Sequence, residues 1–239
     1  MFGIGTLINT LAIIIGGLFG SIVSKVLNEG QRQSLIKACG ISVLFIAIAG
    51  AMEGMLKIEE GSVMSGQSML VVLCLAIGTL IGELIGIENY FIRFGEWLKR
   101  ESGNSKDQAF VGGFVNASLT VCIGAMAIVG AIQDGILSDY STLAVKSVLD
   151  FIIIAIMTTG LGKGCIFSAI PVFFFEGGIT LLAKLISPLL NALSLSYLSL
   201  IGSILIFCVG INLLEQRKIR VANMLPAVII AVIVAYLPF

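Results

Sequence analysis

Residues 2–23 read FGIGTLINTLAIIIGGLFGSIV, an apolar run that contains no Asp, Glu, Lys or Arg. An α-helix of about 20 apolar residues crosses the hydrocarbon core of a bilayer. The run has no positively charged start and is longer than the apolar core of a cleaved signal peptide. We therefore expect it to be a first membrane span that stays in the mature protein.

The composition extends this pattern to the whole chain. Of its 239 residues 58% are hydrophobic and 12% are charged, against roughly 25% charged in soluble domains, and the mean hydropathy is +1.10. These values exclude a cytosolic enzyme, a disulfide-stapled secreted module and a disordered chain. Fourteen basic residues balance fourteen acidic ones, so no basic excess is available for nucleic acid.

Apolar runs bounded by charges predict an all-α, polytopic transmembrane helix bundle, with residues 1–239 forming a single integral membrane domain. The expected spans are 3–24, 36–56, 68–87, 110–133, 141–160, 166–187, 196–214 and 222–238. The count falls to seven if a broken or re-entrant region near 160–178 replaces one full span.

The longest connection, residues 88–109, is predicted to be a cytoplasmic amphipathic helix in the membrane interface. Its apolar side would carry Tyr90, Phe91, Phe94, Trp97 and Leu98, and its charged side Arg93, Glu96, Lys99 and Arg100. We expect it to act as an anchor rather than as a binding element.

Missing residue types narrow the chemistry. The chain has no His, which removes Ser-His-Asp and Cys-His arrangements and His-ligated metal sites. The five cysteines are far apart, at Cys39, Cys74, Cys122, Cys165 and Cys208, and are expected to behave as small apolar residues. We therefore expect neither enzymatic activity nor a cofactor.

Glu176 is the most informative polar residue within a predicted span. An ionisable group in hydrocarbon costs about 2.5–3.5 kcal/mol on insertion scales, so it needs a partner, a cavity or a function. Pro171 precedes Glu176, and Gly177 and Gly178 follow it. One interpretation is a broken helix whose exposed backbone and Glu176 bind an ion or substrate. The other is a kinked helix in which Glu176 is protonated or paired.

Further polar residues lie within the predicted spans. Lys146 and Asp150 share a helical face at i, i+4, which favours a structural ion pair over a site. Glu83 lies in a glycine-rich span near the cytoplasmic headgroups. Asn9, Asn116 and Asn212 either join helices by hydrogen bonds or line a polar path. The candidate substrate- or ion-binding residues are therefore Glu176, Gly177, Gly178, Asp150, Lys146, Asn9, Asn116, Asn212 and Glu83.

Small residues recur four apart, as in Gly16 and Gly20, Gly50 and Gly54, Gly78 and Gly82, and Gly160 and Gly164. Such faces let helix backbones approach closely in lipid. Packing within one bundle is the favoured interpretation, and a homo-oligomer formed through these faces is the alternative.

Several stretches together resemble one family of bacterial membrane proteins. They are 5–9 (GTLIN) with Gly16 and Gly20, 118–128 (SLTVCIGAMAI), Asp134-Gly135, 146–150 (KSVLD), 210–214 (GINLL) and 223–227 (NMLPA). The chain resembles the domain of unknown function 554 (DUF554) family over essentially its whole length. The resemblance implies a bacterial inner-membrane protein with seven or eight spans and carries over no activity or catalytic residue.

The function expected first is a secondary transporter or permease for a small solute or ion, coupled to a proton or Na⁺ and working within the lipid bilayer. In it Glu176, with Asp150, would bind the cation or proton, and helix groups would rock about the site. The alternatives are a passive channel and a non-transporting scaffold or assembly protein.

Loop charges predict the orientation in the plasma (inner) membrane. Connections after odd-numbered spans carry eleven basic residues and the opposite connections three, which places the basic side in the cytoplasm and both termini outside. The eleven are Lys25, Arg32, Lys37, Arg93, Lys99, Arg100, Lys106, Lys163, Arg217, Lys218 and Arg220, and the three are Lys57, Lys146 and Lys184. A reporter fused after Phe239 should be active only outside the cytoplasm. Cytoplasmic activity would contradict this orientation and imply an odd number of spans.

Overall fold

The computed structural model describes every residue except 1–2, 60–61, 187, 189, 216–218 and 237–239. Arg217 and Lys218 thus lie outside the described residues. Six helical segments within the described part are long and apolar enough to cross a membrane. They are α1 (Ile4–Val23), α2 (Glu29–Met55), α3 (Ser68–Ile85), α7 (Ser141–Leu161), η1 with α8 (Lys163–Ser168 and Ala169–Leu181) and α10 (Ala192–Leu214). The prediction of an all-α polytopic bundle is confirmed.

A bent pair of helices occupies the place of the fourth predicted span. Helix α5 (Phe110–Cys122) ends before Gly124 and α6 (Ala125–Leu137) begins after it. The helix direction bends by 60° between the two. Gly124 has a φ of 154°, a backbone conformation that residues other than glycine rarely adopt. The pair counts as a seventh span if it crosses as one unit.

The remaining elements are short or lie at the ends of the bundle. They are the antiparallel hairpin β1 (Leu56–Glu59) and β2 (Ser62–Ser65), which pairs Leu56 with Ser65, and the helices α4 (Ile87–Glu101), α9 (Ala183–Ile186), α11 (Val221–Met224) and α12 (Pro226–Val234). The eighth predicted span thus folds as the shorter apolar segment Val221–Val234. Residues 87–101 of the predicted amphipathic connection form a helix, whose place in the interface stays a prediction.

The region 160–178 breaks at one end only. Gly162, with a φ of 82°, separates α7 from η1. The expected interruption at Gly177 and Gly178 is wrong, because α8 runs unbroken from Ala169 to Leu181. Two consecutive glycines weaken a helix, yet α8 stays helical through both of them.

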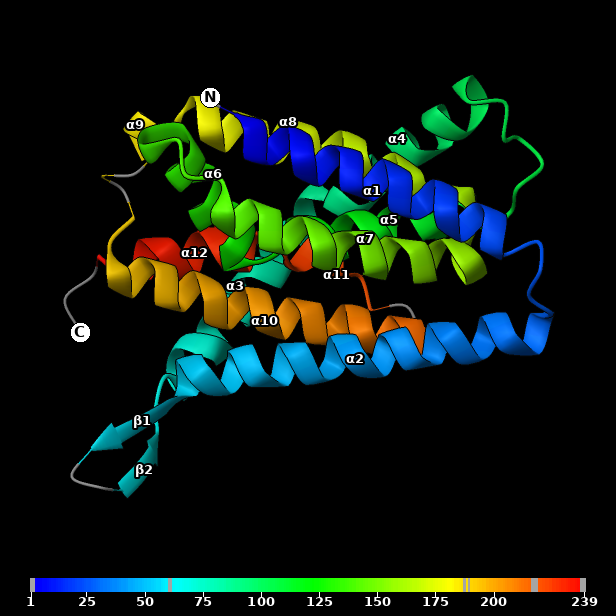
Figure 1. Cartoon of the computed structure of the whole chain (residues 1–239). Helices are drawn as coiled ribbons and strands as arrows, with labels where there is room; N and C mark the ends of the chain where they lie inside the picture. Colours follow the sequence, from blue (N-terminus) through cyan, green and yellow to red (C-terminus); the bar gives the residue numbers. More distant parts are fainter. Residues whose placement is uncertain (1–2, 60–61, 187, 189, 216–218, 237–239) are drawn as a thin grey trace.

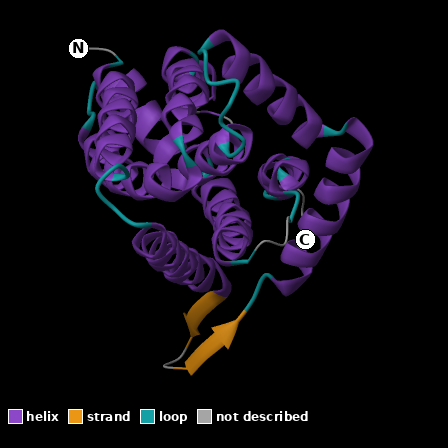
Figure 2. Ribbon diagram, turned by 90° about the vertical axis from the view of Figure 1, so that its right-hand side faces the viewer, coloured by secondary structure: helices purple, strands orange, loops and turns teal. Residues whose placement is uncertain are grey.

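The helices run nearly side by side, and the chain reverses direction between successive long ones (Figure 1). The start of α1, the end of α12 and the β-hairpin therefore lie at one end of the bundle, while α4 lies at the other. Seen from the side that faces right in Figure 1, the bundle closes around its interior and the hairpin projects beyond it (Figure 2).

Glycines set the closest helix contacts. A Cβ built on Gly16 would lie 2.5 Å from the carbonyl oxygen of Phe151, and one on Gly20 would lie 2.2 Å from that of Ala155. Helix α1 thus rests directly on the backbone of α7. Other glycine faces are filled within the chain in the same way, Gly78 by Ala227 and Gly50 by Ser203. Homo-oligomerisation stays a prediction.

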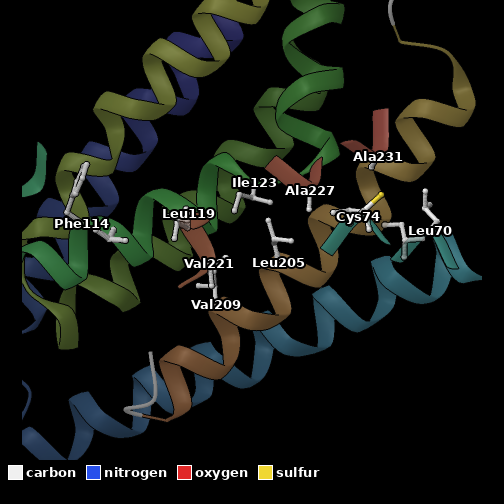
Figure 3. Packing of buried hydrophobic residues seen from close by; sticks show 14 of the residues in the cluster. Leu70, Cys74, Phe114, Leu119, Ile123, Leu205, Val209, Val221, Ala227 and Ala231 are labelled. Atoms are coloured by element: carbon white, nitrogen blue, oxygen red, sulfur yellow. The ribbon is translucent and has the colours of Figure 1, made fainter. Parts of the chain in front are cut away.

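A hydrophobic core joins α3, α5, α10, α11 and α12 (Figure 3). Leu119 and Ile123 at the end of α5 lie close to Leu205 and Val209 of α10 and to Ala227 of α12. This core packs against one side of the bent pair α5–α6. The polar groups described below lie on the other side of that pair.

We predict that Gly20→Ala destabilises the bundle, because the new methyl group would meet the Ala155 carbonyl. Overpacking of this kind costs about 1–3 kcal/mol. The measurement is the free energy of unfolding in a detergent titration. Gly112→Ala is the matched control, since a Cβ there meets nothing within 4 Å and alanine favours a helix by about 0.5–1 kcal/mol. Equal stability of the two variants would contradict the close contact.

Candidate functional site

Four of the predicted candidates meet inside the bundle. They are Asn9 on α1, Lys146 and Asp150 on α7, and Glu176 on α8, and each is at most 6% exposed. Asp150 lies nine residues into α7, or about 13 Å at 1.5 Å per residue, so it lies well inside the span. The pairing of Lys146 with Asp150 agrees with the expected ion pair.

The Lys146 ammonium is the centre of the cluster. It forms an ion pair with Asp150 one turn further along α7 and a second with Glu176, whose Oε1 is 3.5 Å from Nζ. It also donates a hydrogen bond of 2.8 Å to the carbonyl oxygen of Val121. Val121 belongs to the last turn of α5, where carbonyl groups lack helical partners and attract a cation. One buried cation thus ties three helices together.

Glu176 is fully buried, and only one of its two carboxyl oxygens has a hydrogen-bond partner. Asn9 Nδ2 donates to Glu176 Oε1 over 2.8 Å. Glu176 Oε2 and Asn9 Oδ1 are both buried and have no hydrogen-bond partner. Most buried polar side-chain atoms in proteins have a partner, so two such oxygens on one bonded pair point to a missing proton or ligand.

Polar groups continue from this cluster toward the end of the bundle where α1 begins. The hydroxyl oxygens of Thr6 and Thr180 are 3.3 Å apart. Beyond them Gly5 N–H donates to Asp134 Oδ2 over 2.8 Å, which satisfies a free donor in the first turn of α1. Asp134 is fully buried, and its other oxygen has no partner.

On the opposite side of the cluster, the next helical turn is apolar. Ile13, Ile154 and Val172 each lie one helical turn from Asn9, Asp150 and Glu176, and all three are 0% exposed. They belong to a second hydrophobic cluster that also includes Val43 and Met157. The polar row therefore stops at these aliphatic side chains.

The other predicted residues lie elsewhere or act differently. Glu83 pairs with Arg220 at 3.0 Å, and both side chains are partly exposed. Asn212 exchanges two hydrogen bonds of 2.8 Å with the backbone of Ile219, so it shapes a loop. Asn116 is half-buried on α5 and its carbonyl accepts from Thr120. Gly177 and Gly178 offer no broken backbone, since α8 is continuous.

Sequence reasoning missed the outer part of the row. Thr6, Asp134 and Thr180 were not among the candidates, because a hydroxyl or a carboxylate near a span end is tolerated in any membrane helix. The available signal was spacing: Thr6 and Thr180 lie one turn from Asn9 and Glu176 on the same helical faces.

A cavity of about 480 Å³ lies beside the cluster, at the break between α5 and α6. Apolar side chains dominate its walls, which come from α4, α5, α6, α8, α10 and α12. They include Phe91, Leu119, Ile128, Pro171, Phe175, Leu198 and Val228. The cavity is also lined by Ser118 and Cys122 near the end of α5, and by Phe175, the neighbour of Glu176.

We predict that Lys146→Met destabilises the protein by about 3–5 kcal/mol, since it leaves buried carboxylates without their cation. Lys146→Met combined with Asp150→Leu should recover most of the loss, because an apolar pair can replace a buried ion pair. Unfolding in a detergent titration measures both. Lys163→Met is the control at an exposed lysine of η1. A Lys146→Met variant as stable as the control would contradict a central role for Lys146.

Comparison with known proteins places the chain in a family. The chain is 27% identical to the uncharacterized membrane protein YdfK of Bacillus subtilis (strain 168) over 97% of its length and 95% of that protein. It is 28% identical to the uncharacterized protein YqgA of Escherichia coli (strain K12) over 95% of its length and 94% of that protein. No solved structure matches it. The family described as "Protein of unknown function (DUF554)" matches residues 4–236, and the chain belongs to this family of membrane proteins.

Proposed function

We propose that the protein is a secondary transporter or permease, rather than an enzyme, and that Asn9, Lys146, Asp150 and Glu176 bind its coupling cation or proton. The observation that carries the proposal is the charge balance of the cluster. Two buried carboxylates face a single ammonium, and one oxygen of Glu176 has no partner. An unbalanced buried charge is costly, so the cluster favours uptake of one positive charge.

The one-sided polar row supports a transporter over a passive channel. A channel needs a polar path to both ends of the bundle. Here the row leads from Asp134 and Thr6 to Glu176 and ends at Ile13, Ile154 and Val172. Alternating access requires a site that faces one side at a time, and the cluster has that form.

The cavity supports a small solute as the cargo. Its volume of about 480 Å³ falls within the range of small-molecule pockets, which is roughly 300–1,000 Å³. It approaches the charged cluster through Phe175, the chain neighbour of Glu176, and through Ser118 and Cys122 of α5, so a solute bound there would lie close to the coupling site. The apolar walls favour a solute with a substantial hydrocarbon part.

The proposal includes the location. We place the protein in the plasma (inner) membrane with the end of the bundle that carries the start of α1 outside, as the loop charges predict. The polar row from Glu176 through Thr6 and Thr180 to Asp134, which is buried along its length, would then lead toward the outer side.

The first test is a thermal-stability screen of the purified protein in detergent against cations, amino acids and carboxylates. A ligand at about 100 times its dissociation constant adds about 2.7 kcal/mol to the folded state. We expect a hit to stabilise wild type and Glu83→Gln equally, since Glu83 lies outside the cluster, and to stabilise Glu176→Gln clearly less.

Flux assays in proteoliposomes then test transport itself. Saturable uptake driven by an ion or pH gradient, present in wild type and Glu83→Gln and lost in Glu176→Gln, is the expected result. Conductance without saturation would replace the proposal by a channel. No flux of any hit, with Glu176→Gln severely destabilised, would replace it by a scaffold.

A further inference from the structure

We infer that Glu176 carries a proton in this structure and that this proton joins its carboxyl group to the Asn9 amide. The inference rests on the proposed function and names its coupling ion as a proton. Asn9 and Glu176 share one hydrogen bond, from Nδ2 to Oε1, and each keeps one buried oxygen without a partner. One proton on Glu176 Oε2 supplies the donor that both oxygens lack, in the paired form that a carboxylic acid and a primary amide make.

A metal cation fits the same atoms less well. Hard cations such as Mg²⁺ and Ca²⁺ take about six to eight oxygen ligands. Within the described part of the chain no group of three or more His, Cys, Asp or Glu side chains could hold a metal ion. The Lys146 ammonium lies 3.5 Å from Glu176 Oε1 and would repel a second cation. A proton needs one oxygen to carry it and a second oxygen to accept its hydrogen bond. Glu176 Oε2 and Asn9 Oδ1 are two such oxygens without partners.

Protonation also balances the buried charges. With Glu176 neutral, Lys146 and Asp150 form one ion pair of zero net charge, and the ammonium keeps Val121 as its third acceptor. Loss of the proton leaves two carboxylates on one ammonium. Loss of the proton thus changes the net charge of Lys146, Asp150 and Glu176 from zero to minus one, and its return restores zero, which is the change that a coupling site has to make.

The other titratable groups near Glu176 are few. Lys146 and Asp150 face it from α7, Cys122 lies at the end of α5, and Asp134 on α6 lies beyond Thr180 and binds Gly5. Helix α1 contributes Asn9 and Thr6, which do not titrate. Of these groups Asp150 competes most directly for a proton, but it has Lys146 as a direct partner.

Infrared spectroscopy of the reconstituted protein tests the inference. A protonated carboxyl group has a carbonyl stretch at higher frequency than a carboxylate. We expect this band at pH 7 in wild type and in Glu83→Gln, and its loss in Glu176→Gln. Asn9→Leu should keep the band and shift it to higher frequency, because the acid loses its hydrogen-bond partner. Identical bands in wild type and Glu176→Gln would overturn the inference.

A stability measurement gives a second readout. Glu176→Gln imitates the neutral acid, since its amide can donate to Asn9 Oδ1, and we expect it to fold. The folded wild type holds a proton that the unfolded chain releases at neutral pH, so its stability falls as pH rises. The apparent Tm of wild type should therefore drop by several degrees between pH 6 and pH 9 relative to Glu176→Gln. Parallel curves would count against the proton.

These outcomes are separate from those of the transport assays. If Glu176→Gln fails to fold, the acid band of wild type and its shift in Asn9→Leu still decide the question, and a wild type without the band would overturn the inference. If Glu176 is protonated but the protein shows no flux, the inferred proton site stands and the proposed transport function is refuted. If Na⁺ drives flux and Glu176 is ionised, the transport function stands and the inferred proton is refuted.

Discussion

The structure depends on how one buried ammonium is satisfied. Lys146 lies where a charge costs about 2.5–3.5 kcal/mol unless partners surround it, and its partners come from three elements. They are the Asp150 carboxylate on its own helix, Glu176 on α8 and the Val121 carbonyl on α5. Asn9 adds α1 by binding Glu176. Four separate segments of the chain must meet at this point, and that requirement accounts for much of the bundle's arrangement.

Two local features serve this meeting point. In a continuous helix the Val121 carbonyl would accept from the backbone four residues later, so the break after Cys122, with Gly124 at its centre, frees that oxygen for Lys146. Gly16 and Gly20 let α1 rest on the backbone of α7. This contact keeps Asn9 beside the face of α7 that carries Lys146 and Asp150. Backbone irregularity in a membrane is tolerated where protein groups satisfy it, and here a side chain does so.

The sequence predicted what local pattern controls and missed what depends on distant contacts. Six of the eight predicted spans are span-length helices that followed from apolar runs, and the Lys146–Asp150 pair followed from i, i+4 spacing. The break at Gly124 was missed, because the Val121 carbonyl that it frees is bound by an ammonium 25 residues further along the chain. Gly177 and Gly178 misled in the other direction, because tertiary packing overrode their low helix propensity. Asn9 and Glu176 were both candidates, but their separation of 167 residues meant that no spacing rule could pair them.

The same contacts indicate which helices can move. If Glu176 has to face both ends of the bundle in turn, as the proposed transport requires, some helices must shift while others hold the frame. Helices α1 and α7 touch backbone to backbone at Gly16 and Gly20, so sliding one past the other would break many contacts at once. A Cβ at Gly178 or Gly124 would meet nothing within 4 Å, but a Cβ at Gly135 of α6 would meet the Thr180 carbonyl of α8, so α6 and α8 are themselves in close contact. The apolar cavity lies between these same elements. Motion of α6 and α8 together against a fixed α1–α7 pair would keep the Gly135 contact, but it would have to separate Gly17 of α1 from Ile166 of η1.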